Sequence, residues 1–357
     1  MAFIRSLAEI LVPCASLSSG NLGSPGSGQI VGPRRAILVS GLTPPNLKDK
    51  VPSMARSPIT DPLALLTGEL NNFQEIAAYI VPQPGEIPRL DGIDVYGDTM
   101  PLNGVVGGDH IIYVDFKKRY DLLARITQAQ AAGRSEIVAN LERCRDKAGI
   151  VVLDVSGHHA TDALLAAMLH QSFLLGSLYE LDMFGRITRR LFENLNTRFY
   201  HSSSLDKFVT MIYGEIAQDA TFRFLSAAHP PPVVFSNQHD RFMEVSADLC
   251  TSFPPIGTLP SNDVIDRNTT HSVLGFKDKY KLNEWRLMGR GDILLLYTDG
   301  LLEHARGSEP YFPQRLEQTV RSVKHQGARA IFEAIKKDAL DFATPVDDMS
   351  IVVIKRT

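Results

Sequence analysis

Four acidic positions beside apolar strand-like runs are the residues of this chain best suited to carry chemistry. They are Asp109 after Gly107-Gly108, Asp154 after Ile150–Leu153, Asp299 after Ile293–Tyr297, and the pair Asp347-Asp348 before Ile351–Ile354. A single aspartate beside a strand is common, because turns favour this residue. Four positions together are more informative, because converging carboxylates repel each other and lose hydration unless a cation shares the site.

Oxygen ligands of this kind suit hard cations such as Mg²⁺ or Mn²⁺. Two such ions about 4 Å apart can hold a bridging water, lower its pKa and clamp a phosphoryl group for in-line displacement. The sequence has no histidine and cysteine cluster with zinc spacing, no GxxxxGK[ST] phosphate loop and no GxSxG nucleophile motif. The residues alone therefore favour a dinuclear metal hydrolase that acts on a phosphoester.

The stretch from Gly149 to His159 places its aspartate on a rigid element. The apolar run Ile150–Leu153 predicts a buried strand, Ser156-Gly157 predicts a tight turn, and the apolar spacing beyond it predicts a helix. Rigid backbone at the end of a buried strand holds a carboxylate in place. Asp154 is accordingly the central residue of the predicted site.

The remaining elements predict an α+β protein. Helices are expected over residues 62–80, over 120–147 as one helix or two that meet near Gly133, and over 184–199 with Asp182 as the cap. Strands over 207–216 and 220–228 flank Gln218-Asp219 and predict a hairpin. Because strands cluster with strands and helices come in pairs, a sheet sandwich flanked by helices is favoured over a doubly wound fold.

Composition excludes several classes of protein. The 357 residues are 44% hydrophobic and 22% charged, which is ordinary for a globular chain. The net charge of −3 gives no overall excess of basic residues of the kind that supports non-specific nucleic-acid binding. No apolar run is long enough to span a membrane. Three widely spaced cysteines form no disulfide framework, which favours a reducing, cytoplasmic location. Residues 1–57, rich in Ser, Gly and Pro, predict a disordered or loosely packed tail before a domain over 58–357.

The acidic motifs, in their order, resemble a known family. Gly107-Gly-Asp109, Asp154-Val-Ser-Gly-His158, Thr298-Asp-Gly300 and Asp347-Asp-Met-Ser350 are similar to motifs of the SpoIIE-type bacterial branch of the PPM (protein phosphatase 2C-like) metal-dependent Ser/Thr phosphatases. The resemblance extends from about residue 70 to the C-terminus. It implies a central antiparallel β-sandwich flanked by helical layers, in the order α-β-β-α, and residues 117–148 would be a helical insertion.

The resemblance also implies hydrolysis of phosphoserine or phosphothreonine in a protein, with two Mn²⁺ or Mg²⁺ ions and an activated water between them. Asp154 would bridge both ions, with the Val155 carbonyl as a further ligand of one. Asp299 and Asp347 would bind the second ion, and Asp109 would bind or orient metal-bound water. Asp348 would hydrogen-bond metal-bound water, and which residue of the Asp347-Asp348 pair binds directly stays open. The motifs do not indicate the substrate-binding residues.

The implied partner is a phosphorylated protein regulator, of the anti-anti-sigma type, in a bacterial signalling pathway. The helices after residue 160 are a candidate homodimer interface. The chain departs from the family at Ser156-Gly-His-His159, where the usual second glycine is His159. Two alternatives therefore stay open: a catalytically impaired scaffold with the same fold, and a small-molecule metallophosphoesterase.

Overall fold

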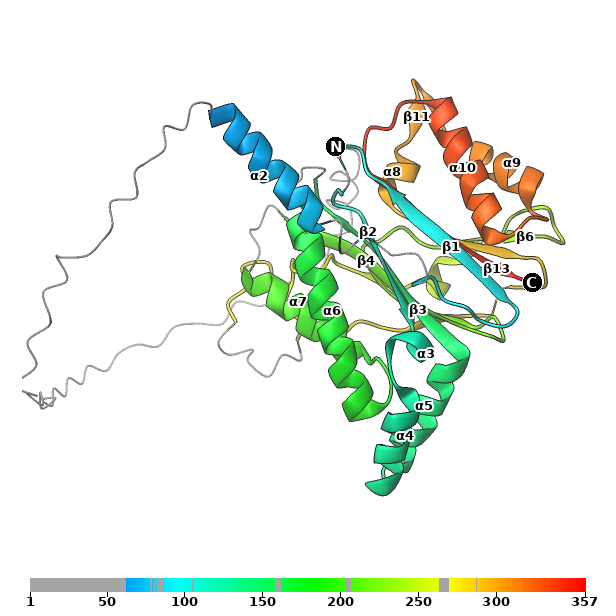
Figure 1. Cartoon of the computed structure of the whole chain (residues 1–357). Helices are drawn as coiled ribbons and strands as arrows, with labels where there is room; N and C mark the ends of the chain where they lie inside the picture. Colours follow the sequence, from blue (N-terminus) through cyan, green and yellow to red (C-terminus); the bar gives the residue numbers. More distant parts are fainter. Residues whose placement is uncertain are drawn as a thin grey trace, which may run out of the picture. The chain divides into compact units, whose positions relative to one another are not determined.

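The computed structural model describes residues 62–77, 79, 81, 86–104, 106–157, 162–202, 207–262, 270–286 and 288–357 (Figure 1). These residues belong to one compact unit, Ile59–Thr357. The N-terminal tail expected over residues 1–57 lies outside the described residues, as do His158 and His159.

Two sheets form the centre of the molecule. The first, called the β1 sheet, has the order β1 (Ile93–Met100), β13 (Met349–Arg356), β10 (Ile293–Tyr297), β6 (Val233–Ser236) and β7 (Arg241–Phe242). The second, called the β2 sheet, has the order β2 (His110–Asp115), β3 (Lys147–Val155), β4 (Val209–Ala217), β5 (Phe222–Ala227) and β8 (Ser252–Phe253), and β9 (Asn283–Trp285) also pairs with β5. Neighbouring strands are antiparallel except β5 and β8. β4 and β5 form the predicted hairpin.

The apolar core has three layers, one between the two sheets and one on the outer face of each sheet. Successive side chains along a strand alternate between the inner layer and an outer layer. In β3, Ile150 and Val152 point between the two sheets, whereas Val151 and Leu153 point outward to a helical layer. In β13, Val352 belongs to the layer between the sheets and Val353 to the opposite outer layer. Because successive side chains in a strand face opposite ways, a continuous apolar strand buries both faces. The two central strands are therefore buried on both sides.

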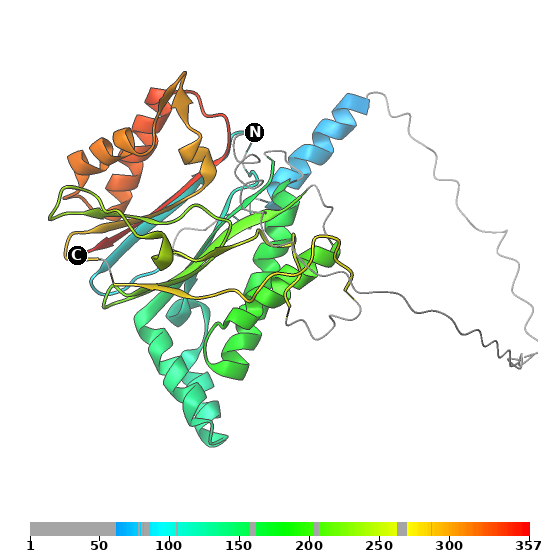
Figure 2. The same cartoon turned by 180° about the vertical axis from the view of Figure 1, so that it is seen from behind.

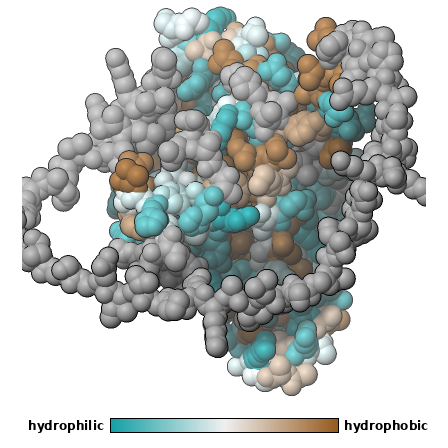
Figure 3. All heavy atoms as spheres, turned by 90° about the vertical axis from the view of Figure 1, so that its left-hand side faces the viewer, coloured by the Kyte–Doolittle hydropathy of each residue, from teal (hydrophilic) through white to brown (hydrophobic). Residues whose placement is uncertain are grey.

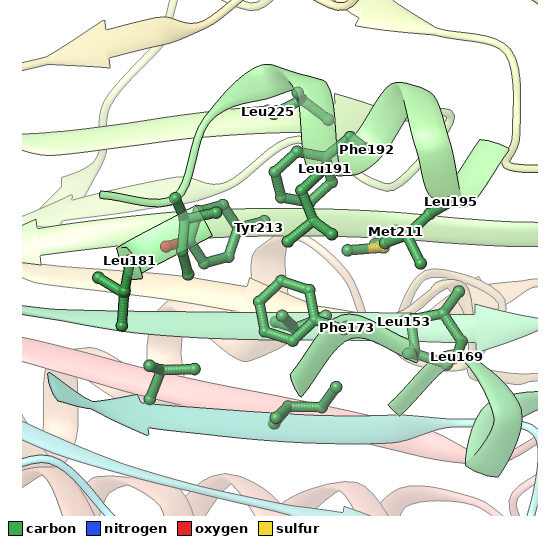
Figure 4. Close-up of a cluster of buried hydrophobic side chains, with 14 of the residues drawn as sticks. Leu153, Leu169, Phe173, Leu181, Leu191, Phe192, Leu195, Met211, Tyr213 and Leu225 are labelled. Carbon is green, nitrogen blue, oxygen red and sulfur yellow. The ribbon is translucent and has the colours of Figure 1, made fainter. Parts of the chain in front are cut away.

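Helices cover both outer faces of the sandwich (Figures 1 and 2). α9 (Gln314–Val323) and α10 (Ala328–Phe342) pack on the β1 sheet. α6 (Asp162–Phe184) and α7 (Arg189–Ser202) pack on the β2 sheet, where Phe173 of α6, Phe192 of α7 and Tyr213 of β4 contact one another (Figure 4). The predicted α-β-β-α sandwich is thus confirmed. No described helix combines the length and the apolar character that crossing a bilayer needs.

The other helices are shorter or lie at the margin. They are α2 (Pro62–Ala77), α3 (Phe116–Arg119), α4 (Leu122–Ala131), α5 (Ser135–Arg143), α8 (Asp299–Leu302) and the 3₁₀ turns η2 (Cys144–Asp146) and η3 (Ala247–Leu249), beside a small ladder of β11 (Ala305–Arg306) and β12 (Glu309–Pro310). α3 to η2 occupy the segment expected to be a helical insertion. α4 and α5 meet at Gly133, whose positive φ of 67° suits glycine.

One predicted helix boundary is wrong. Asp182, expected to cap a helix over residues 184–199, lies in the last turn of α6 and pairs with Arg125 at 2.9 Å. α6 continues to Phe184 and ends at Gly185, which has a φ of 66° and approaches the Ile137 carbonyl so closely that a Cβ would lie 2.5 Å from it. The boundary depends on α5, a contact that local spacing cannot reveal.

Replacing a buried side chain of α10 is expected to cost far more stability than replacing an exposed one. Phe332→Ala removes a ring that is 1% exposed and meets Tyr96 edge-on, so we expect a loss of about 3–5 kcal/mol in the free energy of unfolding. Leu340→Ala, on the same helix but 46% exposed, should change it by less than about 0.5 kcal/mol. Urea unfolding followed by circular dichroism measures both. Equal effects would contradict the packing of α10 on the β1 sheet.

Candidate active site

Strand register brings the predicted aspartates to one end of the sandwich. Asp109 directly precedes β2, and the pairing of His110 with Leu153 places it beside Asp154 at the end of β3. In the other sheet, Tyr297 pairs with Ile351, so Asp299 after β10 lies near the start of β13. In both sheets, antiparallel pairing places the start of one strand beside the end of its neighbour, so aspartates at these positions lie close together.

The carboxylates are close enough to raise one another's pKa. Burial raises the pKa of Asp154 first, and repulsion from Asp299, Asp347 and Asp348 raises it further. Burial, then Asp154, raises the pKa of Asp109, which is 5% exposed. The pKa of Asp299 rises to about 6, through burial and then the Asp347 charge. Each shift has the sign expected for buried like charges.

Asp348 holds the segment that leads to Asp109. Its Oδ1 accepts a hydrogen bond from the Leu102 backbone N–H at 2.5 Å, and its Oδ2 accepts one from Gly108 N–H at 2.7 Å. A Cβ on Gly107 would lie 2.0 Å from Asp348 Oδ2, so only glycine allows this approach. Both carboxylate oxygens are therefore engaged by backbone groups, a charge-assisted arrangement that fixes the loop.

Thr298 orients Asp109 from the opposite sheet. Its hydroxyl donates to Asp109 Oδ2 at 2.6 Å and accepts from the Ser350 backbone N–H at 2.9 Å. Its own N–H donates to the Ser350 carbonyl at 3.1 Å. Thr298 is fully buried, and since its carbonyl accepts from Leu301 N–H at 3.2 Å, none of its polar groups is unsatisfied.

A second hydroxyl and a histidine lie behind Asp154. Thr210, its partner across β3 and β4, makes a long 3.5 Å hydrogen bond to Asp154 Oδ2 and a 3.0 Å bond with His229 Nδ1. Burial lowers the pKa of His229 to about 3, and the Tyr297 backbone acts in the opposite direction. His229 is therefore neutral at physiological pH.

The turn after Asp154 is tied to the start of α6. Lys207 Nζ donates to the Ser156 carbonyl at 2.9 Å and pairs with the buried Asp162 at 2.7 Å. Gly157 has a φ of 109°, and a Cβ there would lie 2.6 Å from an Asp162 oxygen. Lys207 therefore links Ser156, two residues after Asp154, to the first residue of α6.

The donor chemistry of the site fits hard cations. No lysine or arginine of the described residues pairs with Asp109, Asp154 or Asp299, so no cationic side chain offsets the repulsion between them. In the part of the chain that the structure describes, no three acidic, histidine or cysteine side chains close into a group that could hold an ion as they stand. The oxygens interact across the site, but side-chain movement would be needed to complete a ligand shell.

The structure brings all the predicted carboxylates together, whereas their individual roles stay predictions. The Val155 N–H donates to the Gly108 carbonyl at 3.3 Å, and nothing in the structure tests the proposed role of its own carbonyl. The sequence reasoning missed three positioning contributions: Thr298, Thr210, and the Lys207–Asp162 pair. Thr298 stands inside a recognised motif, so its position was a signal, whereas Thr210 and Lys207 lie in no motif.

Comparisons with known proteins agree with this geometry. Residues 145–357 match the family Stage II sporulation protein E (SpoIIE). No curated protein matches the chain by sequence. Among solved structures, the SiaA PP2C domain of Pseudomonas aeruginosa is similar with a TM-score of 0.53 and 16% identity, over 82% of this chain and 97% of that one.

Two longer proteins share the fold. The RsbU and RsbW domains of Rv1364c from Mycobacterium tuberculosis give a TM-score of 0.52 at 17% identity over 77% of this chain. The PP2C phosphatase domain with a regulatory fragment of SpoIIE from Bacillus subtilis gives 0.52 at 15% over 75%. The match spans 64% of each of those chains. The chain belongs to the SpoIIE family, whose fold is that of the PPM-type serine/threonine phosphatase domains.

Proposed function

We propose that this protein hydrolyses phosphoserine or phosphothreonine in a protein with the help of two divalent cations, Mn²⁺ or Mg²⁺. The observation that carries the proposal is the convergence of buried and half-buried aspartates at one end of a PPM-type sandwich, where Asp109, Asp154 and Asp299 have no cationic partner among the described residues. Buried like charges are costly, and a protein retains them where a bound cation offsets the repulsion.

We propose a task for each aspartate, and hydrogen bonds support those of Asp348 and Asp109. Asp154 is the proposed bridging ligand, with Asp299 and Asp347 as ligands of the second ion and the Val155 carbonyl as a further ligand. Both oxygens of Asp348 already accept backbone hydrogen bonds, so its proposed task is to hold the Gly107-Gly108 segment. Thr298 holds the Asp109 carboxylate in one orientation. When bound, the cations would lower the pKa of a shared water and offset the charge of the phosphoryl group.

Asp154→Asn should abolish cation-dependent phosphatase activity and leave the fold intact. The amide removes a charge that repels three neighbouring carboxylates. In the absence of divalent cations, the variant should therefore unfold at the same temperature as the parent or at a higher one. It should also lose the stabilisation that Mn²⁺ gives the parent. Phosphate release from a phosphopeptide and thermal unfolding with and without Mn²⁺ measure these effects.

The outcomes separate the proposal from its alternatives. Full activity in Asp154→Asn would refute the cation role. A parent protein that neither binds Mn²⁺ by calorimetry nor releases phosphate would be a scaffold. Faster hydrolysis of nucleotides or sugar phosphates than of phosphopeptides would indicate a small-molecule phosphoesterase.

Thr298→Val should reduce activity by about 10- to 100-fold, because it removes the hydroxyl that orients Asp109 and keeps the shape of the side chain. Thr298→Ser restores the hydroxyl and should recover most of the rate. Steady-state kinetics with a phosphopeptide measures both variants. Full activity in Thr298→Val together with a loss in Thr298→Ser would show that packing of the Thr298 methyl group, rather than its hydrogen bond, is what matters.

The substrate that we propose is a phosphorylated signalling regulator of the anti-anti-sigma type, in the bacterial cytoplasm. Membership of the SpoIIE family supports the substrate class. Cys144 and Cys250 are both free thiols, in agreement with a reducing compartment.

We further propose a homodimer through α6. One face of this helix is buried, yet the other also carries apolar side chains at spacings of four and seven residues. They are Leu164, Met168, Leu175, Tyr179 and Met183, each between 43% and 63% exposed. The side of the molecule that carries α2 and α6 faces the viewer in Figure 3, where brown apolar atoms are exposed. An exposed apolar stripe of this kind is typical of an interaction surface.

Introducing charge into this stripe should separate the dimer. Leu175→Glu combined with Tyr179→Glu should shift the mass measured by analytical ultracentrifugation from dimer to monomer, because two carboxylates would lose hydration in the interface. Leu123→Glu, on α4 and 65% exposed, is the matched control and should leave the mass unchanged. A monomeric parent protein would refute the proposal.

A further inference from the structure

A large cavity lies far from the acidic site, on the same face of the β2 sheet as α7. Its volume is about 1120 Å³, and its wall includes Lys147, the first residue of β3, and Arg186, just before α7. Asp154 is seven residues further along β3, which at the rise of a strand corresponds to about 23 Å. The cavity is therefore separate from the candidate active site.

The wall of the cavity is strongly basic. Among the described residues that line it, eight are lysine or arginine and two are glutamate. Both glutamates are already paired. Glu215 accepts from Lys147 Nζ at 2.5 Å and from the Tyr213 hydroxyl at 2.8 Å. Glu193 accepts from the Lys277 ammonium at 3.0 Å and from Tyr280 N–H at 2.7 Å.

Several lysine and arginine side chains of the wall are not neutralised by an ion pair within the described residues. Arg186, Arg190 and Lys281 form no ion pair with an acidic side chain in the part of the chain that the structure describes. Among the described residues Arg189 donates to the Tyr280 carbonyl alone, at 3.5 Å, and a carbonyl does not neutralise a guanidinium. Cations gathered around a concave, low-dielectric wall focus a positive potential into the space between them.

We propose that this cavity binds a small polyanion of nucleotide size that carries two or more phosphate groups. Guanidinium groups match phosphate oxygens in a bidentate geometry, and several arginines here converge on one cavity. Phe192, Ile187 and Leu282 add apolar surface to the same wall. The volume lies just above the roughly 300–1,000 Å³ of typical small-molecule pockets, so a ligand of nucleotide size fits. This binding site is additional to the phosphatase site and independent of it.

Calorimetric titration of the full chain tests the proposal, with tripolyphosphate and ATP as probes. The protein is kept free of divalent cations with EDTA, so that the acidic site cannot capture a cation–phosphate complex. We expect one bound probe per chain, with binding that weakens as salt rises. Tighter binding of ATP than of tripolyphosphate would show that a base contributes, whereas equal binding would identify a polyphosphate site.

Substitutions on two parts of the wall locate the binding. Arg186→Glu and Lys281→Glu are both at exposed positions, and each should weaken binding at least tenfold. Arg134→Glu makes the same change of charge as Arg186→Glu at the exposed turn between α4 and α5 and should leave binding unchanged. Absence of binding to the parent chain, or binding that both cavity variants retain, would overturn the proposal. Binding of an acidic peptide alone, abolished by the cavity variants, would replace it with a protein-docking surface.

Discussion

The carboxylate of Asp348 joins the two sheets at the end where the aspartates meet. It belongs to the segment before β13, and it accepts hydrogen bonds from the Leu102 and Gly108 backbone, in the segment that connects β1 of the same sheet to β2 of the other. Thr298 adds a second link at the same place through Asp109. Like charges at one site would drive these segments apart, so the convergence depends on hydrogen bonds that hold each carboxylate in position.

Close approach at this end also limits the residues between the aspartates. A Cβ on Gly300 would lie 2.0 Å from the Asp348 carbonyl oxygen, and one on Gly108 would lie 2.6 Å from the Gly157 carbonyl oxygen. Neither neighbour can withdraw easily, because both contacts are with backbone. A side chain at either glycine would therefore clash with backbone, which restricts both positions to glycine.

Local sequence patterns were sufficient for the strands and for the acidic set, because both depend on short-range periodicity. Ile150 to Leu153 and Ile351 to Ile354 are apolar at every position, which indicates burial on both faces. The pairing of β1 with β13 could not be predicted, because Ile93 and Arg356 lie at opposite ends of the domain and neither segment specifies the other. The end of α6 and the role of Thr210 were missed for the same reason, since each depends on a contact with a distant element.

Overall charge also concealed a feature that only the fold reveals. A net charge of −3 indicates a nearly neutral chain, yet β3 begins with Lys147 at a basic cavity and ends with Asp154 among carboxylates. The strand is buried and rigid between these ends, so the two groups of charges stay about 23 Å apart. At physiological ionic strength the Debye length is about 8 Å, so charges at one end are largely screened from the other where solvent intervenes. The two proposed sites, for cations at one end and for anions at the other, would therefore have little electrostatic interference between them.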